Sequence, residues 1–161
     1  MAASEPAEQY QRPYLESSVL ISWIKGEAGR QWTVDHILRL AERDIFKIYT
    51  STLTLAEVHK HRDQPKLLSN EQDERILAYF EHDFFQFIDV DRNIGEHANR
   101  LCREHGLFPN DAIHLACALR AGCDVLLSWN GRLNRVQHPH IRTEEPRMLG
   151  QAELPEMPLP Q

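Results

Sequence analysis

The fold is decided by one stretch of this chain, Phe108-Pro109-Asn110-Asp111-Ala112-Ile113-His114-Leu115-Ala116-Cys117-Ala118-Leu119. Its residues are apolar at nearly every position of a helix, and a helix that is apolar on every side is buried. Pro109 and Asn110 are typical of a helix start, because proline suits the first turn and asparagine caps it. Asp111 is therefore expected in the first turn, where unpaired backbone N–H groups favour negative charge. Taken alone, the stretch leaves two interpretations of Asp111 open, a capping residue or a functional carboxylate.

The rest of the chain alternates between strand patterns and helix patterns. After the apolar helix, Val125-Leu126-Leu127-Ser128 is a short continuous apolar run, typical of a buried parallel strand. Further strands are predicted at Ile45–Thr50, Phe84–Val90 and Ile141–Thr143, and a strand-to-helix passage at Tyr14–Ile21. Helical spacing predicts helices over Arg30–Arg43, Glu71–His82 and Asp91–His105. This alternation predicts an α/β fold with a central, mostly parallel sheet of four to five strands, flanked by helices on both faces.

Length and composition indicate one globular domain. The 161 residues are enough to bury a core, and apolar and charged fractions of 42% and 26% are ordinary. A formal net charge of −6 argues against a protein that coats nucleic acid with a broad basic surface, although it allows an enzyme with a local groove. We expect residues 1–12 to be a flexible lead, 13–149 a single domain and 150–161 a proline-rich tail.

Several features indicate a cytoplasmic protein that does not contact a membrane. The first residues are polar and lack the apolar segment of a signal peptide, and no run has the length of a transmembrane helix. Cys102, Cys117 and Cys123 are odd in number and lack zinc-type spacing. They are expected to be free thiols in a reducing compartment.

Two further carboxylates follow predicted strands. Glu16 interrupts the apolar passage Tyr14–Ile21, and a buried carboxylate is costly unless it is paired or binds a cation. It could also cap the following helix together with a neighbouring serine. Glu57 lies among apolar residues, but it is also the third residue after Thr54, which is the spacing of a capping box. Capping therefore remains an alternative to chemistry for both residues.

These polar residues are predicted to converge at one edge of the sheet, because ligands of parallel sheets bind outside the carboxyl ends of the strands. Carboxylates that share a cleft repel one another unless a cation neutralises them, and hard oxygen ligands select Mg²⁺ or Mn²⁺. Such a cluster suits phosphodiester hydrolysis. A glycine-rich phosphate loop and a Gly-x-Ser-x-Gly elbow are both absent from the sequence, which argues against an NTPase and a serine hydrolase.

Four motifs carry a family resemblance: Tyr14–Ile21, Leu55–Val58, Asn110–Ala116 and Asp124–Asn130. In order and spacing, between about Tyr14 and Met148, they resemble the motifs of PIN-domain ribonucleases, and among these the VapC-like toxins of type II toxin–antitoxin systems. The resemblance implies a PIN-like fold and cleavage of RNA that depends on Mg²⁺ or Mn²⁺. It also implies a homodimer that a cognate antitoxin protein inhibits.

The resemblance also implies roles for particular residues. Glu16, Glu57 and Asp111 would be metal ligands, and Asn130 would hold the fourth position directly or through water. Supporting roles fall to Ser17 and Ser128. The candidates for contacts with RNA phosphates are basic residues of the first half of the chain: Lys25, Arg30, Lys60 and Arg62.

The chain departs from the family pattern at the site. The first acid is normally Asp, whereas this chain has Glu16, which places the carboxylate on the order of 1 Å further out, and Mg²⁺ tolerates little distortion. Asn130 is neutral where Asp is frequent, and Arg132 stands where a further acid is common. A catalytically weak or inactive PIN domain that binds RNA or protein is therefore the alternative function.

Four aromatic side chains have simpler expected roles. His114 is interpreted as a hydrogen-bonded core residue rather than a metal ligand, and Trp129 as packing at the edge of the cleft. Trp23 and Trp32, near the amino-terminal helices, are the candidates for a dimer surface.

Overall fold

The structure, a computed structural model, describes residues 10–59 and 68–150. The predictions for Lys60, Arg62, residues 1–9 of the lead and residues 151–161 of the tail lie outside the described residues. Within them, one parallel sheet has the strand order β3-β2-β1-β4-β5. The strands are β1 (Pro13–Leu15), β2 (Ile48–Ser51), β3 (Phe85–Ile88), β4 (Val125–Leu127) and β5 (Arg142–Glu144). The predicted parallel sheet is confirmed, including its short final edge strand.

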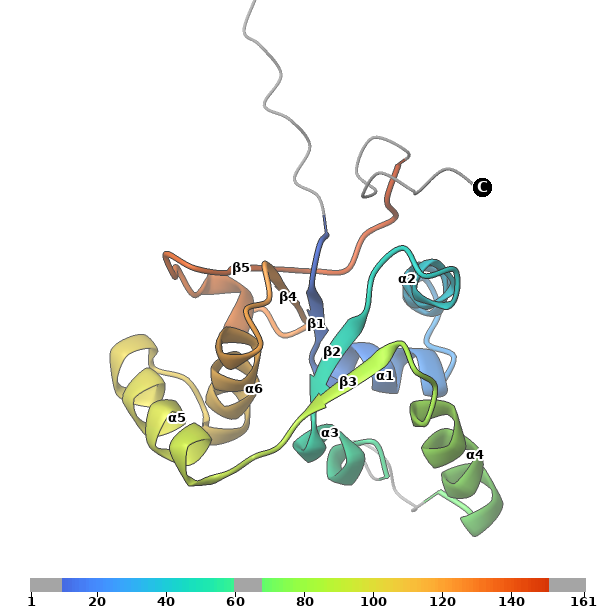
Figure 1. The fold of residues 1–161 in the computed structure, drawn as a ribbon, viewed down its shortest axis with the longest axis horizontal. Helices are drawn as coiled ribbons and strands as arrows, with labels where there is room; N and C mark the ends of the chain where they lie inside the picture. The colour runs from blue at the N-terminus through green and yellow to red at the C-terminus, as the bar shows by residue number, and fades with distance from the viewer. Residues whose placement is uncertain (1–9, 60–67, 151–161) are drawn as a thin grey trace, which may run out of the picture.

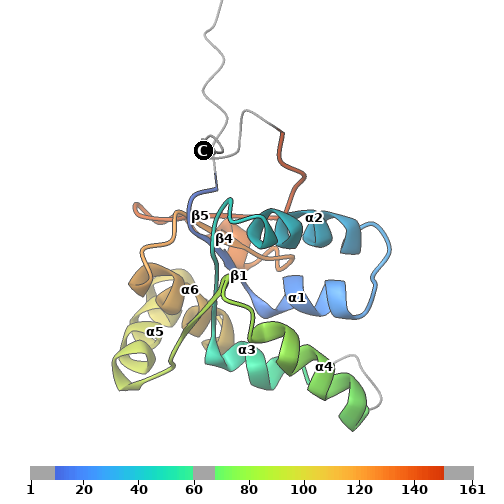
Figure 2. The ribbon, with the colours of Figure 1, turned by 45° about the vertical axis from the view of Figure 1, so that its right-hand side comes forward.

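Helices cover both faces of this sheet, as predicted. Figures 1 and 2 show α1, α2 and α4 on one side and α5 and α6 on the other. The bounds are α1 (Ser17–Ile24), α2 (Gln31–Glu42), α3 (Thr52–Glu57), α4 (Asn70–Phe80), α5 (Arg92–His105) and α6 (Pro109–Arg120). A short 3₁₀ helix, Leu133–Arg135, follows β4.

The two central strands divide their side chains between two apolar cores. Tyr14 and Leu126 pack with α5 and α6, whereas Leu15 and Leu127 pack with α1 and α2. This division follows from the pleat, because successive side chains of a strand point to opposite faces. All four side chains are fully buried. Burial on both faces explains why the sequence of each strand is continuously apolar rather than alternately apolar and polar.

The apolar stretch from Phe108 to Leu119 forms most of α6, and the prediction that this helix is buried is confirmed. Six of its residues from Ala112 to Ala118 are inaccessible to solvent: Ala112, His114, Leu115, Ala116, Cys117 and Ala118. The helix begins at Pro109, and Phe108 occupies the N-cap position, so the expected cap by Asn110 is wrong. Asp111 lies in the first turn, as predicted.

The expected capping box at Glu57 is also wrong. Helix α3 begins at Thr52 rather than after Thr54, and Glu57 is its last residue. The Thr54 hydroxyl lies 2.8 Å from the Thr50 hydroxyl in the protein interior and is therefore occupied away from the helix terminus. Glu57 thus has no capping role.

Two apolar side chains that lie at helical spacing in the sequence face solvent. Trp32 is 70% exposed, because it lies in the first turn of α2 on the side opposite the buried Val34 and Ile37. Leu77 is 41% exposed, since α4 contacts the core through Tyr79 and Phe80 instead.

The packed structure begins before the expected domain start at residue 13. Tyr10 is fully buried, and its hydroxyl donates to the Glu144 carboxylate at 2.8 Å. The backbone N–H groups of Gln11 and Arg12 donate to the Asp124 carboxylate. None of the helices described is both long and apolar enough to cross a membrane. Cys102, Cys117 and Cys123 are free cysteines.

Candidate functional site

The strand order places the carboxyl ends of β1 and β4 at a topological switch point. From β1 the chain moves outward through β2 and β3, and it then returns to the other side of β1 as β4 and β5. The direction of winding reverses between β1 and β4, which is where parallel α/β sheets bind ligands. Glu16 directly follows β1 and Ser128 directly follows β4, and the Glu16 N–H donates to the Leu127 carbonyl at 3.0 Å.

Glu16 is buried and is held by three serine hydroxyls. The residue is 5% exposed, and its side-chain oxygens accept hydrogen bonds from Ser17 at 2.7 Å, Ser18 at 2.5 Å and Ser128 at 2.9 Å. Burial pushes the pKa of this carboxyl upward, but His114 and the three hydroxyls outweigh burial and leave the pKa below its ordinary value. Although Glu16 occupies the N-cap position of α1, its side chain makes no capping hydrogen bond. The capping interpretation of Glu16 is therefore wrong.

Asp111 is joined to Glu16 through the segment after β4. The Asn130 side-chain amide donates to the Asp111 carboxylate at 3.0 Å, and the Asn130 N–H donates to the Ser128 hydroxyl at 2.9 Å. Ser128 in turn donates to Glu16, so one hydrogen-bonded chain connects the two carboxylates. Burial and the charge of Glu16 raise the pKa of Asp111. We call Glu16 and Asp111 the acid pair.

Glu57 is connected to the acid pair through a histidine. His114 is fully buried, and its Nε2 lies 2.7 Å from a Glu57 carboxylate oxygen and 3.9 Å from one of Glu16. Its Nδ1 lies 2.7 Å from the Tyr14 hydroxyl. The interpretation of His114 as a hydrogen-bonded core residue is confirmed, and the structure adds that its ring orients Glu57.

The structure thus brings together Glu16, Asp111, Asn130, Ser17 and Ser128, with Glu57 attached through His114. Lys25 lies elsewhere, in a groove between α1 and α4.

Sequence reasoning missed Ser18 and Tyr14 as functional positions. Ser18 is adjacent to predicted site residues and was found only as a capping alternative. The contact of Tyr14 with His114 spans 100 residues, and a single sequence carries no local pattern for it.

The donor chemistry of the acid pair suits a hard divalent cation. Carboxylate oxygens and the Asn130 amide oxygen are the ligand types that Mg²⁺ and Mn²⁺ prefer. The charge of Glu16 raises the pKa of Asp111, and a cation between the two carboxylates would relieve this repulsion. In the ranges 10–59 and 68–150, no three His, Cys, Asp or Glu side chains are grouped so as to hold an ion. The fit therefore rests on the two carboxylates, because the Asn130 NH₂ group faces Asp111 and the Asn130 oxygen accepts from the Arg132 N–H.

Two arginine–aromatic contacts border the acid pair. The Arg30 guanidinium lies 4.8 Å from the centre of the Trp129 ring, and that of Arg132 lies 4.0 Å from the centre of the Phe108 ring. The Trp129 indole N–H donates to the Ser22 hydroxyl at 3.0 Å and its ring packs against the core, which confirms the expected packing role.

Solved structures of low sequence identity share this fold. A toxin–antitoxin complex from Klebsiella pneumoniae has a chain that is 19% identical with a TM-score of 0.62, and the match covers 85% of this chain and 99% of that one. VapC20 of Mycobacterium tuberculosis, a sarcin–ricin-loop-cleaving toxin, is 15% identical with a TM-score of 0.63, over 81% and 98% of the chains. VapBC2 from Rickettsia felis, bound to a DNA fragment of its promoter, is 15% identical with a TM-score of 0.58, over 84% and 98%.

No curated protein matches the sequence. The PIN domain family, however, matches residues 14–139, which run from β1 past the 3₁₀ helix. This range contains the acid pair and the residues joined to it by hydrogen bonds or through His114, which together we call the acid network: Glu16, Ser17, Ser18, Glu57, Asp111, His114, Ser128 and Asn130. The resemblance found in the sequence motifs is thereby confirmed, and the chain belongs to the PIN domain family.

Proposed function

We propose that this protein is a metal-dependent endoribonuclease that hydrolyses phosphodiester bonds of RNA, and that it is the VapC-like toxin of a toxin–antitoxin pair. The observation that carries the proposal is the buried acid pair, linked through Ser128 and Asn130 at the carboxyl ends of β1 and β4. Membership of the PIN domain family supports the nuclease activity. The likeness to toxin structures from three bacteria supports the toxin role.

In this proposal the chain's own residues arrange the carboxylates. Glu16 and Asp111, with Asn130, would hold Mg²⁺ or Mn²⁺, and Glu57 is the proposed third carboxylate. When bound, the ion would lower the pKa of a water molecule and neutralise charge that develops on the phosphate. Ser17 and Ser128 fix the orientation of Glu16, as does Ser18. Asn130 does the same for Asp111.

The proposed partners are RNA, a cognate antitoxin protein and a second copy of the chain. Lys25, Lys60 and Arg62 remain candidates for contacts with RNA phosphates. Trp32 is the better candidate for the homodimer surface, because it is 70% exposed. The Trp23 ring instead packs against the ring of Tyr79, with 4.9 Å between the ring centres. Light scattering should give the mass of a dimer for the native chain and of a monomer for Trp32→Ala. We place the protein in the cytoplasm, which the three free cysteines support.

Metal-dependent cleavage of a structured RNA tests the proposed activity. The native protein should cut in Mn²⁺ or Mg²⁺ and should lose cutting in EDTA. Asp111→Asn keeps the shape of the side chain but removes the charge, and should abolish cleavage. Asp89→Asn, at an exposed position after β3, is the matched control and should cleave as the native protein does. Equal cleavage by the Asp111 variant and the native protein would show that the acid pair is not the catalytic site.

A binding module without cleavage is the second candidate function, and the state of Glu16 favours it. Both carboxylate oxygens of Glu16 already accept hydrogen bonds, and Asn130 adds no negative charge. Glu16→Asp separates the two functions, because the shorter side chain would move away from the serine hydroxyls. A gain in metal-dependent cleavage would identify a nuclease weakened by the longer side chain. RNA binding without cleavage in both proteins would identify a binding module.

A further inference from the structure

The segment after the acid network is basic although the whole chain is acidic. Residues 130–143 contain three arginines and two histidines and no aspartate or glutamate, in a chain with a formal net charge of −6. The segment begins with Asn130, which contacts Asp111, and continues through the 3₁₀ helix to β5. Arg142 pairs with Glu144 at 3.7 Å, so Arg132 and Arg135 are the positive charges of this segment that follow Asn130 most closely in the chain.

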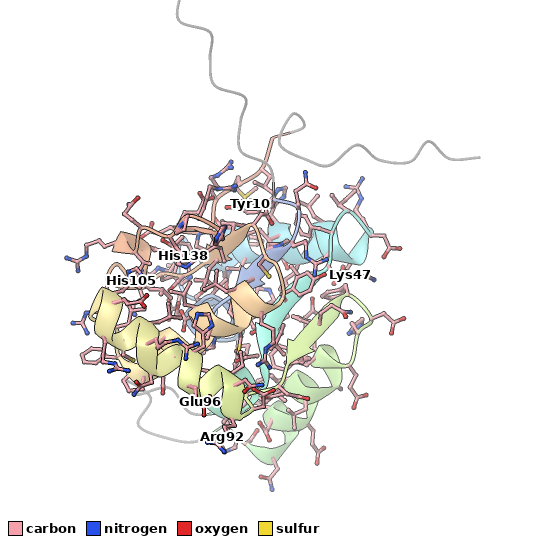
Figure 3. All side chains as sticks on the ribbon, turned by 60° about the vertical axis from the view of Figure 1, so that its left-hand side comes forward. Tyr10, Lys47, Arg92, Glu96, His105 and His138 are labelled. Carbon is pink, nitrogen blue, oxygen red and sulfur yellow. The ribbon has the colours of Figure 1, made fainter. Side chains whose placement is uncertain are left out.

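Part of this segment lines an open groove of about 620 Å³. The groove is lined by Arg132, Arg135, Val136 and Gln137 of this segment and by His105 and Gly106 at the end of α5. His138 also lies near this end, with its ring 6.3 Å from that of His105. Figure 3 shows these two histidines near one another, whereas Arg92 and Glu96 lie at the opposite end of α5.

The groove adjoins the acid pair through Arg132. The Arg132 guanidinium stacks on Phe108, which is the N-cap residue of α6, and the helix carries Asp111 in its first turn. The Arg132 N–H also donates to the Asn130 side-chain oxygen at 3.0 Å. Among the described residues, no carboxylate forms an ion pair with the guanidinium of Arg132 or Arg135.

We propose that this groove holds the RNA backbone on one side of the acid pair, with Arg132 and Arg135 each contacting a phosphate. The proposal rests on the proposed function and extends it to residues outside the acid network. A guanidinium presents paired N–H donors that match phosphate oxygens, and stacking on Phe108 holds that of Arg132 in place before RNA binds. A concentrated basic patch on an acidic protein also directs RNA to this face.

The test measures how RNA binding depends on salt. Fluorescence anisotropy of a labelled single-stranded RNA is recorded in EDTA over a KCl series, for the native protein and for the double variant Arg132→Met with Arg135→Gln. Methionine at position 132 can still cover Phe108. The matched control combines Arg43→Gln with Arg92→Gln, which removes the same two charges from exposed positions outside the groove. Arg92 is separated from His105 by about 20 Å along α5, from the helical rise.

The groove variant should lower the slope of log affinity against log salt by about 1.4, because each lost single-strand phosphate contact contributes about 0.7. When salt falls from 1 M to 0.1 M, the affinity of the groove variant for RNA should therefore rise about 25-fold less than that of the native protein. The control should keep the native slope. The double variant Arg132→Lys with Arg135→Lys keeps both charges and should show most of the native slope. Thermal melting checks that each variant is folded.

Three outcomes would overturn the proposal: an unchanged slope in the groove variant, an equal loss of slope in the control, or no RNA binding by the native protein. Cleavage of RNA by the native protein in Mn²⁺ is measured in parallel. If the native protein cleaves but the groove variant keeps its slope, the assignment of the groove fails while the proposed function stands. If RNA binds through the groove but is never cleaved, the nuclease activity fails while the groove assignment stands.

Discussion

The hydrogen bond between Tyr14 and His114 offers a sharp test of how the site is built. Both side chains are fully buried, and the Tyr14 hydroxyl lies 2.7 Å from His114 Nδ1. The other ring nitrogen of His114, Nε2, lies 2.7 Å from a Glu57 carboxylate oxygen, so each ring nitrogen has one polar partner. Tyr14→Phe keeps the aromatic ring and removes one oxygen, so it leaves His114 Nδ1 buried without a partner.

The expected loss of stability follows from this geometry. A buried polar atom that loses its only partner costs about 1–3 kcal/mol. For a chain of 161 residues, each kcal/mol lowers the melting temperature by about 2–4 °C, so Tyr14→Phe should lower it by roughly 2–12 °C. The urea m-value should stay the same, since the surface exposed on unfolding hardly changes.

Tyr79→Phe is the matched control, because it deletes the same oxygen from a less buried position. The Tyr79 hydroxyl donates to the exposed carboxylate of Glu42 at 3.3 Å, where water can replace the tyrosine. The control should change the free energy of unfolding by no more than about 0.5 kcal/mol. Equal urea midpoints for the native protein and Tyr14→Phe would refute the reasoning. The hydrogen bond between Tyr14 and His114 would then contribute nothing to the free energy of unfolding.

Three further predictions address the site, the core and the response to acid. Asn130→Asp adds a third carboxylate to the acid pair, so Mn²⁺ should bind more tightly in calorimetry. In EDTA the added negative charge is not neutralised, and the melting temperature should fall. An unchanged affinity for Mn²⁺ would argue against an ion at the acid pair. Leu126→Ala opens a cavity in a central strand and should cost about 2–5 kcal/mol in urea unfolding, and a cost below 1 kcal/mol would contradict its burial. Hydrogen bonds from Arg120 lower the pKa of Asp91 to about 2, below its value in the unfolded chain. This stabilisation is present above about pH 4 and is lost as the pH falls toward 2, so Asp91→Asn should flatten the acid side of a plot of melting temperature against pH.

Local patterns were sufficient to predict the main carboxylates of the candidate site. Asp111 opens the apolar helix, and Glu16 interrupts an apolar strand-to-helix passage; the structure places both in the acid pair. Ser128 and Asn130 directly follow a continuous apolar strand, and their roles were implied by the resemblance to PIN-domain ribonucleases. Each of these signals lies within a few residues of the position that it identifies.

Local patterns failed where a side chain's partner is distant in sequence. The spacing from Thr54 to Glu57 matches a capping box, yet Thr54 bonds to Thr50 and Glu57 bonds to His114, which is 57 residues away. Trp32 has an apolar side chain at helical spacing, but it faces solvent. The type of a residue determines which hydrogen bonds its side chain can form. The residues that surround it in the folded structure determine which of these bonds it makes.

The sequence by itself determined the alternation of strands and helices, the parallel sheet covered on both faces, and membership of the PIN domain family. These properties follow from apolar periodicity and motif order, which are local. Only the tertiary structure decided that Ser17, Ser18 and Ser128 hold Glu16, that His114 orients Glu57, and that Arg132 stacks on Phe108 beside the acid pair. Except for the bonds from Ser17 and Ser18, these contacts join segments that are far apart in the chain. They depend on the strand order β3-β2-β1-β4-β5 and on how α6 packs against the sheet, because neither arrangement leaves a local pattern in the sequence.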